Sequence, residues 1–181
     1  MRVAAHNEAT PGQIVQHMPM AQARYRSLGS HAQSIDVVAP PDAVYDLVAD
    51  ITRTPQMSPE CRQTEWLGEP GRPEVGARFR GRNSWRGFRW WRQARIVEAD
   101  RPRIFAFETV PGHGIYNDTT RWHYQFEPIA SGTLVTESYA LSGPRWIGLF
   151  DRILGRPRAL RRNLPRSLKA LKQAVETAGE F

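Results

Sequence analysis

Hydrophobic and polar residues alternate through the middle of the chain and then change to a helical spacing toward its end. Trp122, Tyr124 and Phe126 lie two residues apart, and Phe105 and Phe107 repeat that spacing one segment earlier. A period of two places such rings on one face of a β-strand. A sheet face that carries so many aromatic rings must be covered by another element, because large rings are costly to leave in water.

Seven segments have the length and alternation of strands, and turn residues separate most of them. They span residues 30–38, 63–67, 77–85, 88–98, 103–110, 119–127 and 133–141. Short connections rich in turn residues favour antiparallel pairing of the last six. One helix is expected over residues 41–50, because Pro41 suits the first turn of a helix and apolar residues follow it at helical spacing.

The C-terminal part of the chain offers a cover for this sheet. Apolar residues recur there every three or four positions, first at Trp146, Leu149, Phe150, Ile153 and Leu154, and then, after an interruption at Gly155 and Pro157, at Leu160, Leu164, Leu168, Leu171 and Val175. We expect a long helix that packs this stripe on the sheet and is kinked or broken near Leu164, because Pro165 removes a backbone donor. A curved sheet wrapped around such a helix leaves room between them, so the pattern predicts a small-molecule pocket.

The composition is that of one globular domain in a reducing compartment. The chain has 181 residues, 40% of them hydrophobic and 24% charged, and its lone cysteine excludes an internal disulfide framework. No stretch approaches the roughly 20 apolar residues of a membrane span, and the first residues do not read as a secretory signal. We therefore expect a cytoplasmic protein with a flexible N-terminal arm over residues 1–29 and a ligand-binding domain over residues 30–178.

The formal net charge of +7 is concentrated in the C-terminal helix. Eight of the 25 basic residues lie between Asp151 and Glu176 with no acid among them, and the other 17 nearly balance the 18 acidic residues. The simplest interpretation is a solvated helix face. The alternative is attraction to an anionic membrane surface or an acidic partner. Nucleic acid is the least favoured partner, since no recognition-helix, RNA-binding or zinc-finger pattern occurs.

The strand alternation assigns a set of side chains to the inner face of the sheet. The candidates for contact with a ligand are Phe79, Asn83, Trp90, Phe105, Phe107, Trp122 and Tyr139. Any one ring is most simply explained as core filling, because aromatic side chains dominate cores. The set as a whole indicates the wall of a cavity.

Three polar side chains on the same face are the candidates for catalysis. Glu137 alternates with apolar residues, and a carboxylate buried among rings must take up a proton or find a partner such as Arg92 or Asn83. Glu137 paired with Arg92, together with Tyr124, would polarise a ligand carbonyl and move a proton. The alternative is a strand register shifted by one residue, which would place Glu137 in solvent.

The histidines and the common sequence motifs add little to this picture. His113 lies in a loop flanked by glycines and is a weak candidate for a general base, while His123 alternates with the rings and is expected to face solvent. The chain shows no metal-ligand spacing, phosphate-binding loop or serine-nucleophile motif. We predict neither a metal nor a cofactor.

The order of these elements is similar to that of a known superfamily. The segments SIDVVAPPDAVYDLVADI, VGARFR, ARIVEADRPRIFAFET, TTRWHYQFEPIASGTLVTESYAL and SLKALKQAVE resemble the polyketide cyclase/dehydrase and lipid-transport branch of the START-like (SRPBCC, Bet v 1-like) superfamily, over about residues 30–178. The resemblance implies an α+β helix-grip fold, in which a curved antiparallel sheet of six to seven strands wraps around a long kinked C-terminal helix. It also implies a deep pocket between the two.

The resemblance does not settle the function, because one fold can carry many activities. We expect the protein to bind a hydrophobic small molecule, such as a lipid, a polyketide or a quinone-like compound, as a carrier or sensor. The first alternative is a cofactor-independent cyclase or dehydratase that uses the polar pocket residues. The second is a protein-interaction module that uses the basic C-terminal helix.

Overall fold

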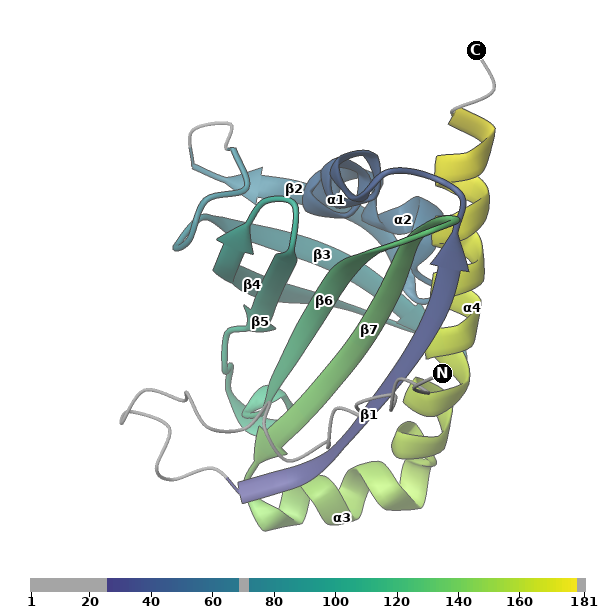
Figure 1. The fold of residues 1–181 in the computed structure, drawn as a ribbon. Coiled ribbons are helices and arrows are strands. Elements are labelled where there is room, and N and C mark those ends of the chain that lie inside the picture. Colours follow the sequence, from purple (N-terminus) through teal and green to yellow (C-terminus); the bar gives the residue numbers. More distant parts are fainter. Residues whose placement is uncertain (1–25, 69–71, 179–181) are drawn as a thin grey trace.

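A curved, seven-stranded antiparallel sheet and one long helix dominate the computed structural model, which describes residues 26–68 and 72–178 (Figure 1). The strands are β1 (Arg26–Val37), β2 (Cys61–Leu67), β3 (Arg78–Trp85), β4 (Phe88–Asp100), β5 (Ile104–Thr109), β6 (Thr119–Ile129) and β7 (Gly132–Gly143), in the spatial order β1-β7-β6-β5-β4-β3-β2. The helices are α1 (Pro41–Ala49), α2 (Thr54–Met57), α3 (Arg145–Leu154) and α4 (Arg156–Ala178), with short 3-10 turns η3 (Ile51–Arg53) and η4 (Gly114–Tyr116).

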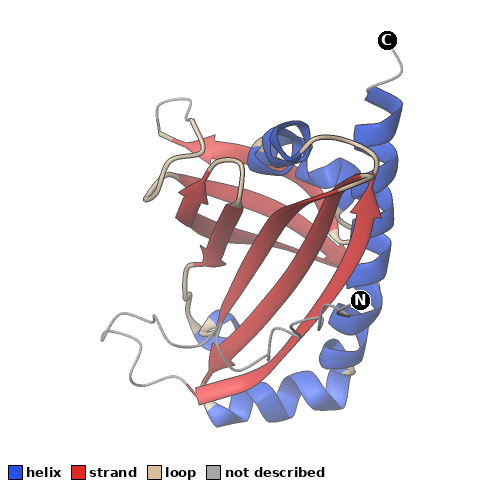
Figure 2. Cartoon of the chain, viewed as in Figure 1, coloured by secondary structure: helices blue, strands red, loops and turns tan. Residues whose placement is uncertain are grey.

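This arrangement confirms the expected α+β helix-grip fold and each of the seven strands. β1 and β7 are neighbours in the sheet although they lie at opposite ends of the strand sequence. The other neighbouring strands follow one another directly along the chain. Figure 2 shows the helices along one side of the sheet and at both of its ends. Most of the expected N-terminal arm over residues 1–29 lies outside the described residues, and its last four residues belong to β1.

The end of the molecule near α1 is filled by tightly packed side chains. The ring of Tyr45 in α1 makes edge-on contacts with Phe105 and Phe126, at centroid distances of 6.1 and 5.7 Å. Leu168 and Leu171 of α4 close the same cluster from the other side. A second, smaller cluster nearer α3 consists of Tyr139, Leu160 and Leu164, with Trp122 packed against it.

The apolar stripe is interrupted at Gly155, as Gly155 and Pro157 predict, but the helix does not break near Leu164, where Pro165 predicted a kink or break. Gly155 has a φ of +76°, a left-handed conformation that ends α3 and turns the chain into α4. α4 then runs unbroken through Pro165, because packing of its apolar face on the sheet outweighs the loss of one backbone donor. Figure 1 shows α3 lying across one end of the sheet and α4 running along its side.

The prediction that the whole apolar stripe packs on the sheet is correct for α4 but wrong for α3. Within α3 only Ile147 is fully buried. Gly148 allows a close approach to β1, since a Cβ atom there would lie 2.8 Å from a methyl group of Leu28. The rest of the α3 stripe points to solvent, because the break at Gly155 turns this segment away from the concave face.

Candidate ligand-binding site

Side chains on the concave face are fully buried near α1, and several are more accessible toward α3. Phe126 and Val135, at the α1 end of β6 and β7, are 2% and 0% exposed. Further along toward α3, Tyr124 and Trp122 of β6 and Phe107 of β5 face the same way but are only half-buried. These rings of β5 and β6 are therefore more accessible than the core near α1, although Trp122 also packs against the smaller cluster of Tyr139, Leu160 and Leu164.

The centre of this concave face holds a buried carboxyl group. Glu137 of β7 is 2% exposed, which resolves its register in favour of burial. Tyr124 lies directly opposite on β6, and its hydroxyl donates to Glu137 Oε1 at 2.9 Å. The hydroxyl of Ser167, on α4, hydrogen-bonds Glu137 Oε2. We call Tyr124, Glu137 and Ser167 the Glu137 cluster; it bridges the sheet and the helix.

Burial dominates the electrostatics of the Glu137 cluster. It raises the pKa of Glu137 to about 7, although hydrogen bonds from Ser167 and Tyr124 oppose the shift. Burial also raises the pKa of Tyr124 well above its ordinary value, and the neighbouring Glu137 adds to that shift. Because no cation is bonded to it, Glu137 changes its protonation state close to neutral pH.

The hydrogen-bond geometry around Ser167 also favours a protonated carboxyl. The Ser167 hydroxyl lies 2.9 Å from the carbonyl oxygen of Leu164 as well as within hydrogen-bond distance of Glu137. A hydroxyl has one proton to donate, so it cannot satisfy both oxygens. When Glu137 is protonated, it donates to Ser167, which in turn donates to Leu164. When Glu137 is ionised, Ser167 must turn toward it and release the Leu164 carbonyl.

Arg92 does not pair with Glu137, contrary to the pairing expected from the sequence. Its guanidinium bonds Asp118 Oδ1 at 2.7 Å, Thr109 Oγ1 at 2.9 Å and the carbonyl oxygen of Tyr116 at 3.1 Å. It therefore ties β4 to the connection between β5 and β6. The carboxylate that binds Arg92 belongs to Asp118, a loop residue, and strand alternation does not predict where loop side chains lie. The Nε–H of Arg92 is buried and has no partner among the described residues.

Some of the predicted aromatic residues belong to the hydrophobic core, and others line the concave face of the sheet. Phe105 is fully buried against Tyr45 and belongs to the core, and Phe79 is also buried, 5.3 Å from the ring of Phe107. Trp122 and Tyr139 form a pair at 5.6 Å in the smaller cluster nearer α3.

Asn83 and Trp90 lie farther from the Glu137 cluster than the other predicted residues. They face each other across β3 and β4 near the β3–β4 turn, and the side-chain amide of Asn83 bonds only its own strand, at the carbonyl of Gly81. The guanidinium of Arg156, from α4, lies 5.7 Å from the centre of the Trp90 ring. These two residues therefore line the rim of the concave face.

Neither histidine of the strand region joins the site. His123 is on the opposite face of β6, but its side chain is only 12% exposed, which corrects the expectation that it faces solvent. Burial lowers the pKa of its imidazole. His113 is exposed just before η4. Among the described residues, no group of three His, Cys, Asp or Glu side chains could hold a metal ion.

The sequence analysis missed Ser167 and a second buried carboxylate, Glu60. Position 167 falls on the buried stripe of α4, so a polar residue there could have been noticed as a partner for Glu137. Glu60 accepts two hydrogen bonds from Arg156 Nη1, at 2.6 and 2.7 Å, and one from Asn163 Nδ2 at 2.6 Å. Nothing near Glu60 in the sequence indicates these partners, which lie about a hundred positions away.

Comparisons with solved structures find many similar folds. The polyketide-cyclase-like protein Cgl2372 of Corynebacterium glutamicum is 32% identical; the match covers 86% of this chain and 95% of that one, with a TM-score of 0.57. The di-domain aromatase/cyclase StfQ of the steffimycin biosynthetic pathway is 13% identical, with a TM-score of 0.66, over 84% of this chain and about half of that one (52%).

A plant protein shares the fold as well. The major latex-like protein 151 of Panax ginseng is 15% identical, with a TM-score of 0.62, over 81% of this chain and 96% of that one. At such identities the last two likenesses concern the fold alone. None of the curated proteins compared with the chain is similar to it in sequence.

The hydropathy of the helices and a match to a protein-family model complete the comparison. No helix in the described part of the chain is long and apolar enough to cross a membrane. The model of the family described as "Polyketide cyclase / dehydrase and lipid transport" matches residues 30–176. The chain therefore belongs to the polyketide cyclase/dehydrase and lipid transport family, whose helix-grip fold it shares.

Proposed function

We propose that the protein is a cytoplasmic carrier or sensor that binds a hydrophobic small molecule between the sheet and α4. The observation that carries this proposal is a protonatable carboxyl at the centre of an aromatic concave face whose rings are partly accessible. Ligand pockets in proteins combine such apolar walls with a few fixed polar groups. Family membership agrees with a hydrophobic ligand.

The Glu137 cluster restricts the chemistry of the ligand. A neutral carboxyl can donate a hydrogen bond to a carbonyl or hydroxyl oxygen of the ligand, and such a bond offsets the cost of burying that oxygen. The half-buried rings of Trp122 and Tyr124 offer flat apolar contacts on either side of the polar centre. We therefore favour a mostly apolar molecule with at least one internal oxygen, such as a lipid, a polyketide or a quinone-like compound.

Native mass spectrometry of gently purified protein, followed by displacement of a fluorescent fatty-acid probe, tests this proposal. Truncation of the cavity wall by Trp122→Ala should weaken probe binding about tenfold or more, since a buried ring provides a large apolar contact. Trp91→Ala is the matched control, because Trp91 is 45% exposed on the outer face. Wild-type protein with no co-purified ligand and no displaceable probe would contradict the proposal.

The same geometry favours a second candidate, a cyclase or dehydratase. A group with a pKa of about 7 is suited to both accepting and donating a proton, and Glu137 has that pKa beside the hydroxyl of Tyr124. Arg92 is excluded from direct contact with Glu137 by its bonds to Asp118, so we assign it a positioning role at most. Turnover of a poly-β-ketone, followed by mass spectrometry, should disappear in Glu137→Gln while far-UV circular dichroism stays unchanged.

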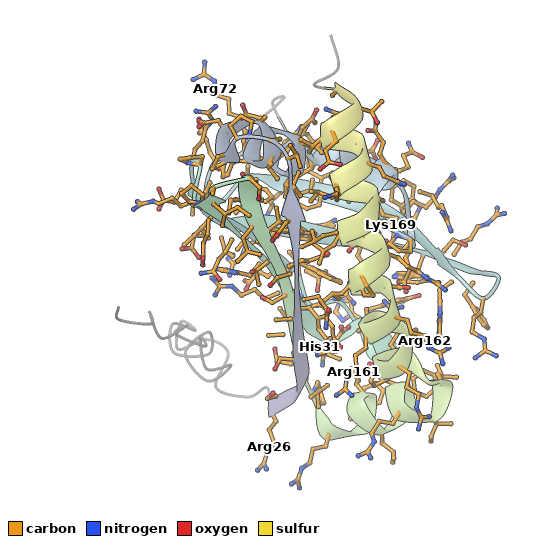
Figure 3. The ribbon with its side chains drawn as sticks, turned by 45° about the vertical axis from the view of Figure 1, so that its right-hand side comes forward. Arg26, His31, Arg72, Arg161, Arg162 and Lys169 are labelled. Atoms are coloured by element: carbon orange, nitrogen blue, oxygen red, sulfur yellow. The ribbon has the colours of Figure 1, made fainter. Side chains whose placement is uncertain are left out.

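We further propose that the basic residues of α4 bring the protein to an anionic membrane. Arg161, Arg162 and Lys169 lie on α4 with exposed side chains (Figure 3). A carrier of a poorly soluble ligand has to meet the lipid phase in which that ligand dissolves. Each exposed basic residue near an anionic surface adds about 1 kcal/mol of attraction.

A further inference from the structure

The end of the molecule at α3 carries an apolar surface that no described segment covers. Five large side chains of this helix are between 41% and 75% exposed: Trp146, Leu149, Phe150, Ile153 and Leu154. Contiguous apolar surface of this kind is uncommon on a water-exposed helix and usually marks an interaction site. Because the break at Gly155 fixes α3 across the end of the sheet, this stripe has no core to pack into.

Two loops add apolar side chains at the same end. The antiparallel topology places the β3–β4 turn and the β5–β6 connection at the end where β7 leads into α3, and these loops expose Phe88, Ile115 and Tyr116. Eight of the eleven exposed large hydrophobic residues therefore belong to this end. Val38 and Val75 lie in connections at the opposite end. The exposed hydrophobic residues are thus concentrated at one end of the molecule, and this concentration indicates an interaction surface.

Arginines border this apolar surface. Arg145 and Arg152 are seven positions apart and so lie along one edge of α3, where both are exposed. A hollow of about 370 Å³ between the end of α3 and the β3–β4 turn is lined by Trp85, Arg86, Leu154, Gly155, Arg158, Ala159 and Arg162. Within the described residues, none of these arginines takes part in a salt bridge. Asp151 is the one acidic residue of α3.

A second hollow beside the β3–β4 hairpin is also lined by arginines. Its volume is about 290 Å³, and its walls are formed by Arg62, Arg82, Asn83, Ser84 and Arg89. The arginines of α3, and those of α4 and the β3–β4 turn that line the first hollow, therefore lie near the apolar stripe, and none of them has a salt-bridge partner among the described residues. That combination, an apolar helix face with a basic edge and a tryptophan, is the pattern of helices that lie in a membrane interface.

We propose that α3 is a membrane-docking helix, which inserts its apolar stripe into the surface of an anionic bilayer while the surrounding arginines bind lipid phosphates. Charge decides between this partner and a second copy of the chain. A symmetric dimer through α3 would bring like-charged arginine edges together, whereas lipid phosphates neutralise them. The carboxylates of an acidic protein would satisfy the arginines but not Leu149 and Ile153.

This inference rests on the proposed carrier function and extends it. The half-buried rings of the concave face lie toward α3 and the filled core lies toward α1, so a protein docked through α3 turns the more accessible half of that face to the lipid. An apolar ligand could then enter without crossing water. Docking by α3 differs from simple electrostatic attraction of α4, because it requires burial of specific apolar side chains in the bilayer.

Sedimentation with vesicles tests the proposal. We expect wild-type protein to bind vesicles of phosphatidylcholine with about 30% phosphatidylglycerol and to bind pure phosphatidylcholine much more weakly. The double variant Leu149→Ser, Ile153→Ser should bind the anionic vesicles about tenfold or more weakly. Val38→Ser, Val75→Ser is the matched control at the opposite end and should bind like the wild type. All variants should keep the fatty-acid displacement signal.

Three outcomes would overturn the inference. If the α3 double variant binds vesicles like the wild type while Arg161→Glu, Arg162→Glu does not, the contact is purely electrostatic. If wild-type protein ignores anionic vesicles and light scattering shows a dimer that the α3 double variant dissolves, the occupant is a second copy. If neither binding nor dimerisation occurs, α3 has no partner of either kind. Retained probe displacement would in each case leave the carrier function standing.

The depth of insertion provides an independent measurement. Brominated acyl chains should quench the tryptophan fluorescence of bound wild-type protein, because Trp146 would lie at the level of the lipid chains. Trp146→Phe should remove most of that quenching and leave vesicle binding nearly unchanged, since phenylalanine still inserts. Equal quenching in both proteins would contradict the placement of α3 in the bilayer.

Discussion

Glu60 and Glu137 are both buried carboxyl groups in contact with α4, and they differ in what holds them. Glu60 meets the guanidinium of Arg156 and the amide of Asn163. Glu137 meets only the neutral hydroxyls of Tyr124 and Ser167. A buried carboxylate next to a cation keeps its charge and serves as a structural tie. One that has only neutral donors moves its pKa toward neutrality and can exchange a proton with a ligand.

Removal of the cation from Glu60 should produce the largest effect. Arg156→Ala leaves a carboxylate with little solvent, and we expect a loss of about 3 kcal/mol in the free energy of unfolding, measured with urea. The variant also loses the stacking of Arg156 on Trp85 and Trp90. Arg158→Ala, at an exposed position two residues away, should cost less than about 0.5 kcal/mol.

A second variant makes this test specific for charge. Glu60→Gln in the Arg156→Ala background removes the uncompensated carboxylate, so it should recover part of the lost stability. Equal losses in Arg156→Ala and Arg158→Ala would show that Glu60 does not depend on its cation, and the contrast with Glu137 would then disappear.

The next effect that distinguishes Glu137 from Glu60 should be a pH dependence of folding stability. Its pKa rises from 4.5 in the unfolded chain to about 7 in the folded protein, so the unfolded state releases its proton first. Folding stability linked to this group is therefore complete below about pH 4.5 and is lost as the pH rises through 7. At about 1.4 kcal/mol for each pH unit between the two values, the loss reaches roughly 3 kcal/mol.

Glu137→Gln isolates this contribution, because glutamine does not titrate. The difference in unfolding free energy between wild type and variant, measured from pH 4 to pH 8, should change steadily in favour of the variant. A difference that stays constant over that range would mean that Glu137 is ionised in the folded protein throughout. Ligand affinity should follow the same titration, weakening above about pH 7 in the wild type only.

Tyr124→Phe should give the smallest effect of the three. It removes a neutral hydrogen bond, for which we expect a cost of about 1 kcal/mol. It also withdraws one donor that favours the ionised carboxylate, so the pKa of Glu137 should rise further above 7. The midpoint of the pH dependence measured against Glu137→Gln reports this shift. A midpoint displaced to lower pH would contradict the assigned hydrogen bond.

The periodicity of the sequence was sufficient to predict the sheet and the side chains on its inner face. Phe79, Trp122, Tyr124, Glu137 and Tyr139 all lie where alternation placed them, because the pleat of a strand leaves no other choice once one face is buried. The partners of polar groups were harder to predict. Arg92 lies on the expected face, yet the loop after β5 supplies its carboxylate, and loops follow no period.

The apolar stripe of α3 and α4 also shows what the sequence could and could not predict. Spacing alone could not tell Leu164 from Leu149, since both lie on apolar faces of helices that are consecutive in the chain. Gly155 separates them, and its left-handed backbone directs one helix along the sheet and the other across its end. The burial of a stripe depends on what lies opposite to it in space.

The sequence by itself determined the strand order along the chain, the inward face of each strand and the concentration of positive charge near the C-terminus, because each follows from local spacing and composition. The tertiary structure alone decided that Ser167 contacts Glu137, that Asp118 binds Arg92, and that no described segment covers the apolar side chains of α3. These outcomes depend on which distant segments come within a few ångströms of each other. At that distance burial and hydrogen bonding set the protonation of a carboxyl and the exposure of a helix.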